Sequence, residues 1–115
     1  MDLKNTKGIK KDSDFRKVYK HGKSFANKYL VMYILDNKSD FSRVGFSVSK
    51  KVGKATVRNK VRRRIREGFR LIGDEYIKSG YDIVFIARIA SKECEYKDIE
   101  KSVKYLINKA QLLKD

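Results

Sequence analysis

Residues 43–70 read RVGFSVSKKVGKATVRNKVRRRIREGFR, and this stretch predicts a strand followed closely by a basic helix. In its first seven residues apolar side chains alternate with small or charged ones, the period of a strand that buries one face. A helix is predicted from about Ala55 to Leu71, where apolar side chains recur every four positions, the period of a helix with one narrow apolar stripe: Val57, Val61, Ile65 and Phe69. Because the second face of the strand carries only Gly45, Ser47 and Ser49 beyond Arg43, we expect another element to lie against it.

Positive charge is concentrated in the same part of the chain. The 115 residues include 29 Lys and Arg against 14 Asp and Glu, a formal net charge of +15. Residues 43–71 contain 11 basic side chains and 1 acidic one, whereas residues 72–115 contain 8 of each. An uneven distribution of this kind creates a directed field, which indicates a docking surface for a polyanion.

The arginines of the predicted helix lie on one side. At 100° per residue, the side chains at offsets 0, 3, 4, 7 and 11 fall within roughly a third of the circumference, opposite the apolar stripe: Asn59, Arg62, Arg63, Arg66 and Arg70. A merely solvated helix face mixes Glu with Lys, but here Glu67 is the single acidic residue. Repulsion along this face lowers helix stability unless a polyanion is bound, so the pattern favours nucleic-acid binding.

Two elements are predicted before this stretch. A short helix begins with Asp12 or Ser13 as its N-cap and ends where Gly22 takes a left-handed conformation. Residues 29–35 form an apolar strand, and we expect it to pair with residues 43–49 as an antiparallel hairpin.

Two more elements are predicted after it. Residues 82–88 form a buried strand, and residues 96–109 form a closing helix with acidic side chains at its start. The order is therefore α-β-β-α-β-α in a single domain, residues 1–115, of the α/β (α+β) class. Its strand-helix-strand unit places two strands parallel in one sheet.

Several other functions are excluded. Gly53-Lys54-Ala55-Thr56 looks like the end of a phosphate-binding loop. That motif requires Gly at position 48 and Ser or Thr at position 55, where this chain has Val48 and Ala55. One cysteine and one histidine cannot form an internal disulfide or a zinc cluster, and nothing resembles a protein-borne catalytic site. The longest apolar run has seven residues and no secretion signal follows Met1, so we expect a cytoplasmic protein.

The two halves of the opening stretch, residues 43–53 and 57–67, closely resemble the signature of the protein subunit of bacterial ribonuclease P. The resemblance extends along nearly the whole chain, including Asp14-Phe15 in the first predicted helix and the strand around Tyr33. Two positions depart from the family pattern. Lys60 stands where the family core reads Arg-Asn-Arg, and Ile89 stands where a proline often follows the last strand.

This resemblance implies a small two-layer sandwich with a mixed sheet and a left-handed β-α-β crossover, against the usual right-handed rule. It implies that the chain is not itself the catalyst. The chain would join a large catalytic RNA that removes the 5′ leader of precursor tRNA with the help of Mg²⁺, and it would bind no cofactor or metal alone.

The resemblance also implies two sets of site residues. The RNA-subunit set is basic and polar: Lys50, Lys51, Arg58, Asn59, Lys60, Arg62, Arg63, Arg66 and Arg70. The set for a cleft that holds the single-stranded leader is aromatic and small: Phe15, Tyr19, Tyr33, Ser47 and Ser49. The rings offer surfaces on which unstacked bases can stack, although Phe15 and Tyr19 are equally compatible with a place in the core.

Two other classes share the charge, size and sheet. One is a non-enzymatic RNA-binding protein such as a ribosomal protein. The other is a DNA-binding helix in a major groove, but no paired-helix pattern with a tight turn supports it.

Overall fold

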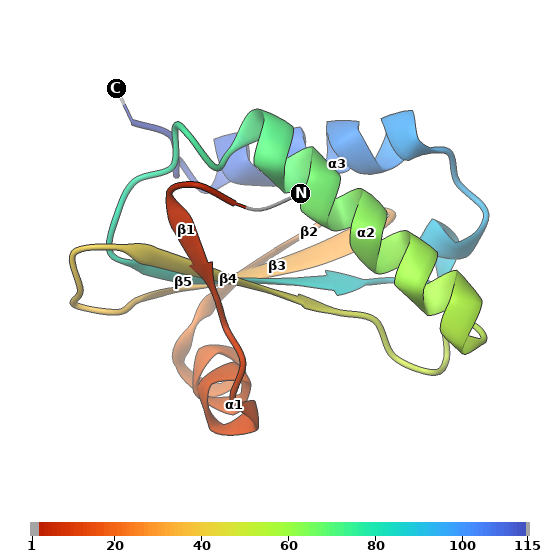
Figure 1. Ribbon diagram of the computed structural model, residues 1–115, viewed down its shortest axis with the longest axis horizontal. Helices are drawn as coiled ribbons and strands as arrows, with labels where there is room; N and C mark the ends of the chain where they lie inside the picture. The colour runs from red at the N-terminus through yellow and green to blue at the C-terminus, as the bar shows by residue number, and fades with distance from the viewer. Residues whose placement is uncertain (1–2, 115) are drawn as a thin grey trace.

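One mixed sheet of five strands organises the computed structural model, which describes residues 3–114 (Figure 1). The strands are β1 (Thr6–Gly8), β2 (Lys23–Ala26), β3 (Leu30–Asp36), β4 (Ser42–Ser47) and β5 (Tyr81–Ala87). The helices are α1 (Asp12–His21), α2 (Ala55–Ile72), the short 3-10 helix η1 (Ile89–Lys92) and α3 (Tyr96–Lys109). The predicted α+β class with a mixed sheet is confirmed.

The strand order, β1-β4-β5-β3-β2, corrects one predicted pairing. The strands predicted as a hairpin, β3 and β4, are antiparallel but not neighbours, because β5 lies between them and pairs with both. The physical reason is that β5 is apolar on both faces: Ile83, Val84 and Phe85 are fully buried, as a central strand requires. The predicted parallel pairing of β4 with β5 is confirmed.

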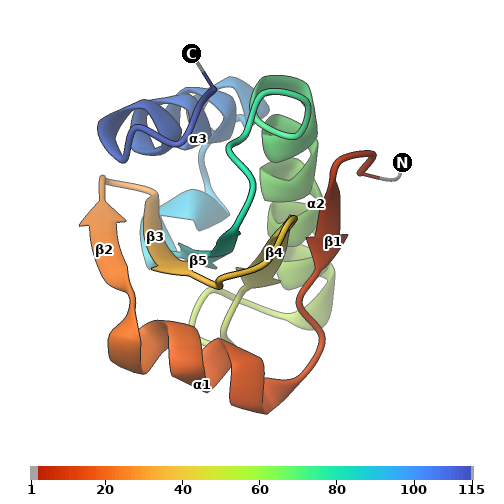
Figure 2. The same ribbon diagram turned by 90° about the vertical axis from the view of Figure 1, so that its left-hand side faces the viewer.

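The connection from β4 through α2 to β5 is left-handed. In Figure 1 β4 and β5 both run from left to right, and α2 returns above them. Figure 2 shows that β4 lies closer than β5 to the viewer of Figure 1. A chain that follows this path turns in the left-handed sense, as the resemblance implied and against the usual rule.

The helices cover both faces of the sheet (Figure 2). On one face α2 and α3 pack over the sheet, and the stripe residues Val61, Ile65 and Phe69 are buried there. The ring of Phe69 meets Phe85 edge to face at 5.9 Å between centroids, a geometry that aromatic pairs prefer. The opposite face is covered by α1 alone. No helix of the described residues is long and apolar enough to cross a membrane.

Both predicted ends of α1 differ in their capping from expectation. The N-cap is Lys11, with no side-chain hydrogen bond, so neither Asp12 nor Ser13 caps the helix. Gly22 has φ −80°, which is not left-handed. A glycine is needed there for space, because a Cβ would collide with the carbonyl oxygens of Val18 and Ile34. The short strands β1 and β2 were not predicted, since three or four mostly exposed residues carry no periodic signal.

Candidate nucleic-acid interface

The face of β4 that carries small residues is where α1 docks. Three alternate positions of the strand each meet one α1 side chain. Arg43 forms an ion pair with Asp14, Gly45 lies beneath the ring of Phe15, and the Ser47 side chain lies next to the Tyr19 hydroxyl. At Gly45 an added Cβ would lie 2.6 Å from a Phe15 ring carbon, so only glycine admits the ring. The expectation that an element lies against this face is confirmed.

A groove runs along the free edge of β4, between α1 and α2. Because β1 pairs only with Ser42–Val44, the edge from Gly45 to Ser47 has no strand beside it among the described residues. Two cavities of about 500 and 360 Å³ lie there and share three lining residues: Phe15, Phe46 and Arg62. We call these two connected cavities the edge groove.

Three of the five members of the predicted cleft set line this groove. Phe15, Tyr19 and Ser47 line it. Tyr33 does not line it; its ring stands edge-on behind Tyr19, with 5.3 Å between ring centroids. Ser49 is exposed beyond the end of β4 and does not line the groove either.

The groove also contains an aromatic ring that the sequence did not single out. Phe46 belongs to the apolar face of β4, and its alternation with Val44 and Val48 predicted only a core residue. Its ring stacks on Phe85 at 6.1 Å with an interplanar angle of 10°, yet it is only half-buried and lines both cavities. The signal that could have revealed this was the open strand edge, which no periodicity encodes.

The hydroxyl of Tyr19 stays protonated across the neutral range. Burial raises the pKa of this phenol above its ordinary value, and the Ser47 side chain acts in the opposite direction by a smaller amount. A neutral phenol adds no negative charge to a groove that would receive an anionic strand.

The basic side chains of α2 divide between two flanks of the helix. Arg62 and Arg66 line the edge groove, whereas Arg63 lies on the other flank, beside Arg64 and Tyr96. Arg62 also donates to the Asn59 side chain at 2.9 Å. The two flanks can therefore meet different ligands.

In two further members of the predicted RNA-subunit set, the side chain is either paired with a carboxylate or half-buried. Arg70 forms two hydrogen bonds with Glu67, of 2.6 and 3.1 Å, which lower the pKa of that carboxyl. Arg58 is half-buried, and its Nε atom has no hydrogen-bond partner. The remaining members are exposed at the start of the helix or in the loop before it: Lys50, Lys51, Asn59 and Lys60.

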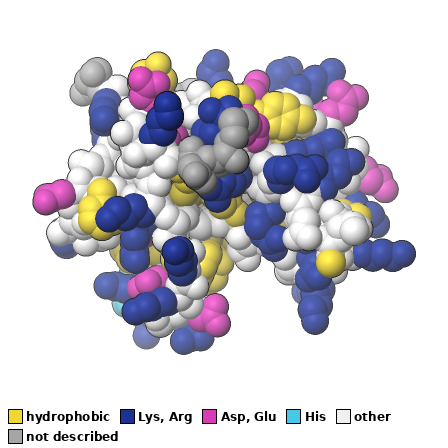
Figure 3. Space-filling view, viewed as in Figure 1, with side chains coloured by type: hydrophobic (Ala, Val, Ile, Leu, Met, Phe, Trp, Pro, Cys, Tyr) yellow, Lys and Arg dark blue, Asp and Glu magenta, His cyan; other side chains and the backbone are white. Residues whose placement is uncertain are grey.

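Lys and Arg side chains cover much of the surface on this side of the molecule, both over α2 and around α1 (Figure 3). Among residues 3–114 no group of three His, Cys, Asp or Glu side chains gathers in a way that could hold a metal ion. What the arrangement offers is a row of cations beside partly exposed aromatic rings, which suits a flexible polyanion with flat bases.

Comparison with known proteins supports one family. The Ribonuclease P family profile matches residues 3–111. A ribonuclease P protein component of Clostridioides difficile (strain 630) is 70% identical over 112 residues, which cover 97% of this chain and 98% of that protein. One of Alkaliphilus oremlandii (strain OhILAs) is 48% identical over 111 residues, covering 96% of each.

Solved structures agree. The RNase P protein of Staphylococcus aureus superposes with a TM-score of 0.85 at 40% identity, covering 93% of this chain and 97% of that one. That of Thermotoga maritima gives 0.80 at 34% identity, covering 90% and 96%. These matches decide against the ribosomal and DNA-binding alternatives. The chain therefore belongs to the ribonuclease P protein family and is the protein component of an endoribonuclease of tRNA 5′ maturation, in which RNA carries the catalysis.

Proposed function

We propose that the edge groove holds the single-stranded 5′ leader of precursor tRNA, while the RNA subunit binds the loop before α2 and the flank of α2 that faces away from the groove. One surface would then contact the substrate and the other the catalytic RNA. The two surfaces adjoin along α2, so the protein would link the leader to the RNA that cuts it.

The observation that carries this proposal is the composition of the groove. Its lining joins aromatic rings, which stack on any base, with arginines, which neutralise phosphates. Cavities of a few hundred Å³ are the size of small-ligand pockets and far too small for a duplex. A strand that threads the groove must therefore be single, as a leader is.

This proposal moves two arginines from the RNA-subunit set predicted from the sequence to the surface that binds the leader. Arg62 and Arg66, predicted for the RNA subunit, line the groove and would contact leader phosphates. Arg63, Lys50, Lys51 and Lys60 would contact the RNA subunit. Tyr33 would act through Tyr19, by holding the ring in place from behind.

The groups that the protein itself provides are for binding. We expect the Mg²⁺ of the assembled enzyme to be held by the RNA subunit, which carries the catalysis. With tRNA precursors as substrate, the assembled enzyme would work in the cytoplasm.

The test uses Tyr19→Ala in the enzyme reconstituted with its RNA subunit. Stacking of one base on one ring contributes about 1–3 kcal/mol, so affinity for leadered precursor tRNA should fall roughly tenfold or more. A leaderless tRNA and the RNA subunit should bind as before. The matched control is Tyr105→Ala, which removes a 51% exposed ring on α3 that does not line the groove. If Tyr19→Ala weakens leadered and leaderless substrates equally, the groove does not hold the leader.

A further inference from the structure

We propose that Asp14 is a positioning residue for the edge groove: by pairing with Arg43 it fixes α1 against β4 and so sets the place of the groove's aromatic rings. The inference rests on the proposed function, because the position of the rings matters only if the groove binds the leader. Asp14 itself does not line the groove.

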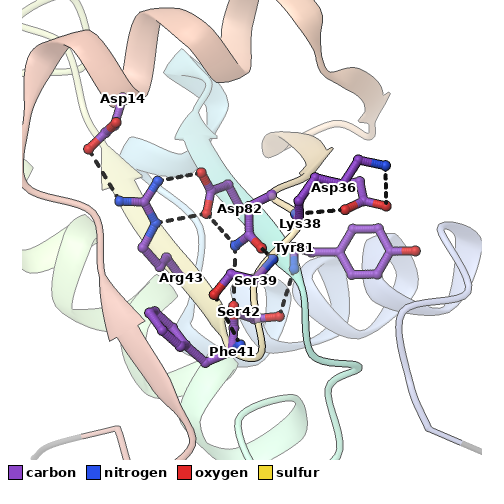
Figure 4. A network of polar contacts seen from close by, with 10 residues as sticks. Asp14, Asp36, Lys38, Ser39, Phe41, Ser42, Arg43, Tyr81 and Asp82 are labelled. Atoms are coloured by element: carbon purple, nitrogen blue, oxygen red, sulfur yellow. Dashed lines mark hydrogen bonds and ion pairs between the residues drawn. The ribbon is translucent and has the colours of Figure 1, made fainter.

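The contact belongs to a small polar network that joins α1 to two strands (Figure 4). Arg43 on β4 donates from Nε to Oδ1 of Asp82 at 2.9 Å and from Nη2 to Oδ2 at 2.6 Å. Its third donor, Nη1, reaches Oδ2 of Asp14 on α1 at 3.2 Å. The guanidinium thus bridges the sheet and the helix.

The sheet side of this bridge is rigid. Arg43 and Asp82 are register partners on neighbouring parallel strands, and two parallel hydrogen bonds fix the guanidinium plane. The side chain of Asp82 is only 4% exposed, and its Oδ1 accepts a further hydrogen bond from Asn37 Nδ2 at 2.8 Å. Burial alone would raise the pKa of Asp82, but the hydrogen bonds from Arg43 and Asn37 outweigh it and lower that pKa, so the carboxylate stays charged. Nη1 is therefore presented to α1 at a set place.

The helix side is held by apolar packing together with this ion pair. Val18 is the single fully buried residue of α1, and Phe15 and Tyr19 pack against the same apolar cluster while staying partly exposed. Asp14 adds a polar attachment a full turn before Val18, and its chain neighbour Phe15 lies on Gly45, two positions along β4 from Arg43. Because a charged hydrogen bond is directional, it restricts the rotation of α1 more than apolar packing alone does. Loss of Asp14 would therefore loosen the positions of Phe15 and, one turn later, Tyr19.

The sign of the effect separates positioning from simple electrostatics. A carboxylate beside an RNA groove repels phosphate, so its removal should strengthen RNA binding if charge is all that matters. Asp12 gives the matched case: it lines the groove, and its carboxylate has no ion pair among the described residues. We expect Asp12→Asn to raise affinity for leadered precursor tRNA, by up to about threefold, and Asp14→Asn to lower it, by about three- to tenfold. Two isosteric changes of the same charge, two residues apart, should act in opposite directions.

The experiment measures three quantities for wild type, Asp12→Asn, Asp14→Asn and Asp14→Glu. They are the affinity of the reconstituted enzyme for leadered and for leaderless tRNA, and hydrogen exchange of the α1 amides in the free protein. Asp14→Asn should leave leaderless affinity unchanged and speed α1 exchange about three- to tenfold, since the helix opens locally more often. Asp14→Glu keeps the charge and should recover part of both effects.

Either of two results would overturn the inference. One is a gain in leadered affinity for Asp14→Asn like that for Asp12→Asn; the other is α1 exchange that does not change. Failure of the proposed function looks different, because Tyr19→Ala would then also leave the leadered and leaderless substrates equal. In that event faster α1 exchange in Asp14→Asn would show that the pair holds the helix but that no leader depends on it, which refutes the positioning role.

Discussion

Replacing Gly45 by Ala tests whether the docking of α1 depends on the missing side chain. The new Cβ would lie 2.6 and 2.7 Å from two ring carbons of Phe15, whereas carbon atoms in contact rest at about 3.5 Å or more. The ring must therefore move by about 0.9 Å, and Ile9, 3.4 Å from the same Cβ, restricts that movement. Overpacking of this size costs about 1–3 kcal/mol of the free energy of unfolding.

The assay is urea unfolding of four proteins: wild type, Gly45→Ala, Phe15→Ala and the double variant. Without the ring, the added methyl group has space, so Gly45→Ala should cost little in the Phe15→Ala background. The two changes should therefore be non-additive by about 1–2 kcal/mol, with unchanged m-values. If the losses in the free energy of unfolding of the two single variants add to within about 0.5 kcal/mol in the double variant, the Phe15 ring does not rest on Gly45, and the docking of α1 on β4 described above would be wrong.

Three more predictions follow from the same contacts. Arg62→Ala should weaken binding of leadered precursor tRNA more than binding of leaderless tRNA, and it should lower the slope of log affinity against log salt by about 0.7, the value for one phosphate contact on a single strand. Arg63→Ala should weaken binding of the RNA subunit alone. The reverse pattern would mean that the two flanks of α2 bind the opposite ligands. Asp82→Asn should lower the free energy of unfolding at pH 7 by about 2–3 kcal/mol. Because the pKa of Asp82 is lowered on folding, its contribution is complete above the unfolded-state pKa of about 4 and is lost as the pH falls through the folded-state pKa, so the gap to wild type should shrink at pH 3, and a constant gap in urea unfolding would contradict this assignment. Sulfate at ten times its dissociation constant should stabilise the free protein by about 1.4 kcal/mol, because anions relieve the repulsion along α2, and thermal melts would show this as a rise of roughly 6 °C. A midpoint indifferent to sulfate would mean that no such repulsion exists.

Long periodic segments of the fold were predictable from the sequence. The ends of α2, β5 and α3 lie within one residue of the predicted ones, because apolar residues repeat over many turns or fill a whole strand. Strand adjacency was not predictable in the same way. The short connection between β3 and β4 favours a hairpin. In the structure β5 takes the place between them, although it begins at Tyr81, 34 residues after β4 ends at Ser47.

The candidate site was predictable in kind but not in its internal division. The arginine face of α2 follows from helical spacing, yet spacing cannot show that β1 ends at Gly8 and leaves an open edge beneath Arg62. From the sequence, Arg43 could be identified only as one more positive charge. Its pairing with Asp14 and Asp82 joins residues 29 and 39 positions apart, which no local pattern encodes.

The central place of β5 has a consequence for how the chain is made. A ribosome that has released the first 80 residues has supplied β1 with β4 and β2 with β3, but not the strand that separates and joins these two pairs. Until β5 emerges, the arginine-rich segment lacks the complete sheet on which its apolar stripe is buried, so we expect it to remain an unfolded polycation next to ribosomal RNA. A nascent chain truncated at residue 80 should therefore be degraded readily by protease, and one extended through α3 should resist it. Folding of this protein is then a late event of its own synthesis, and the surface meant for one RNA is first exposed beside another.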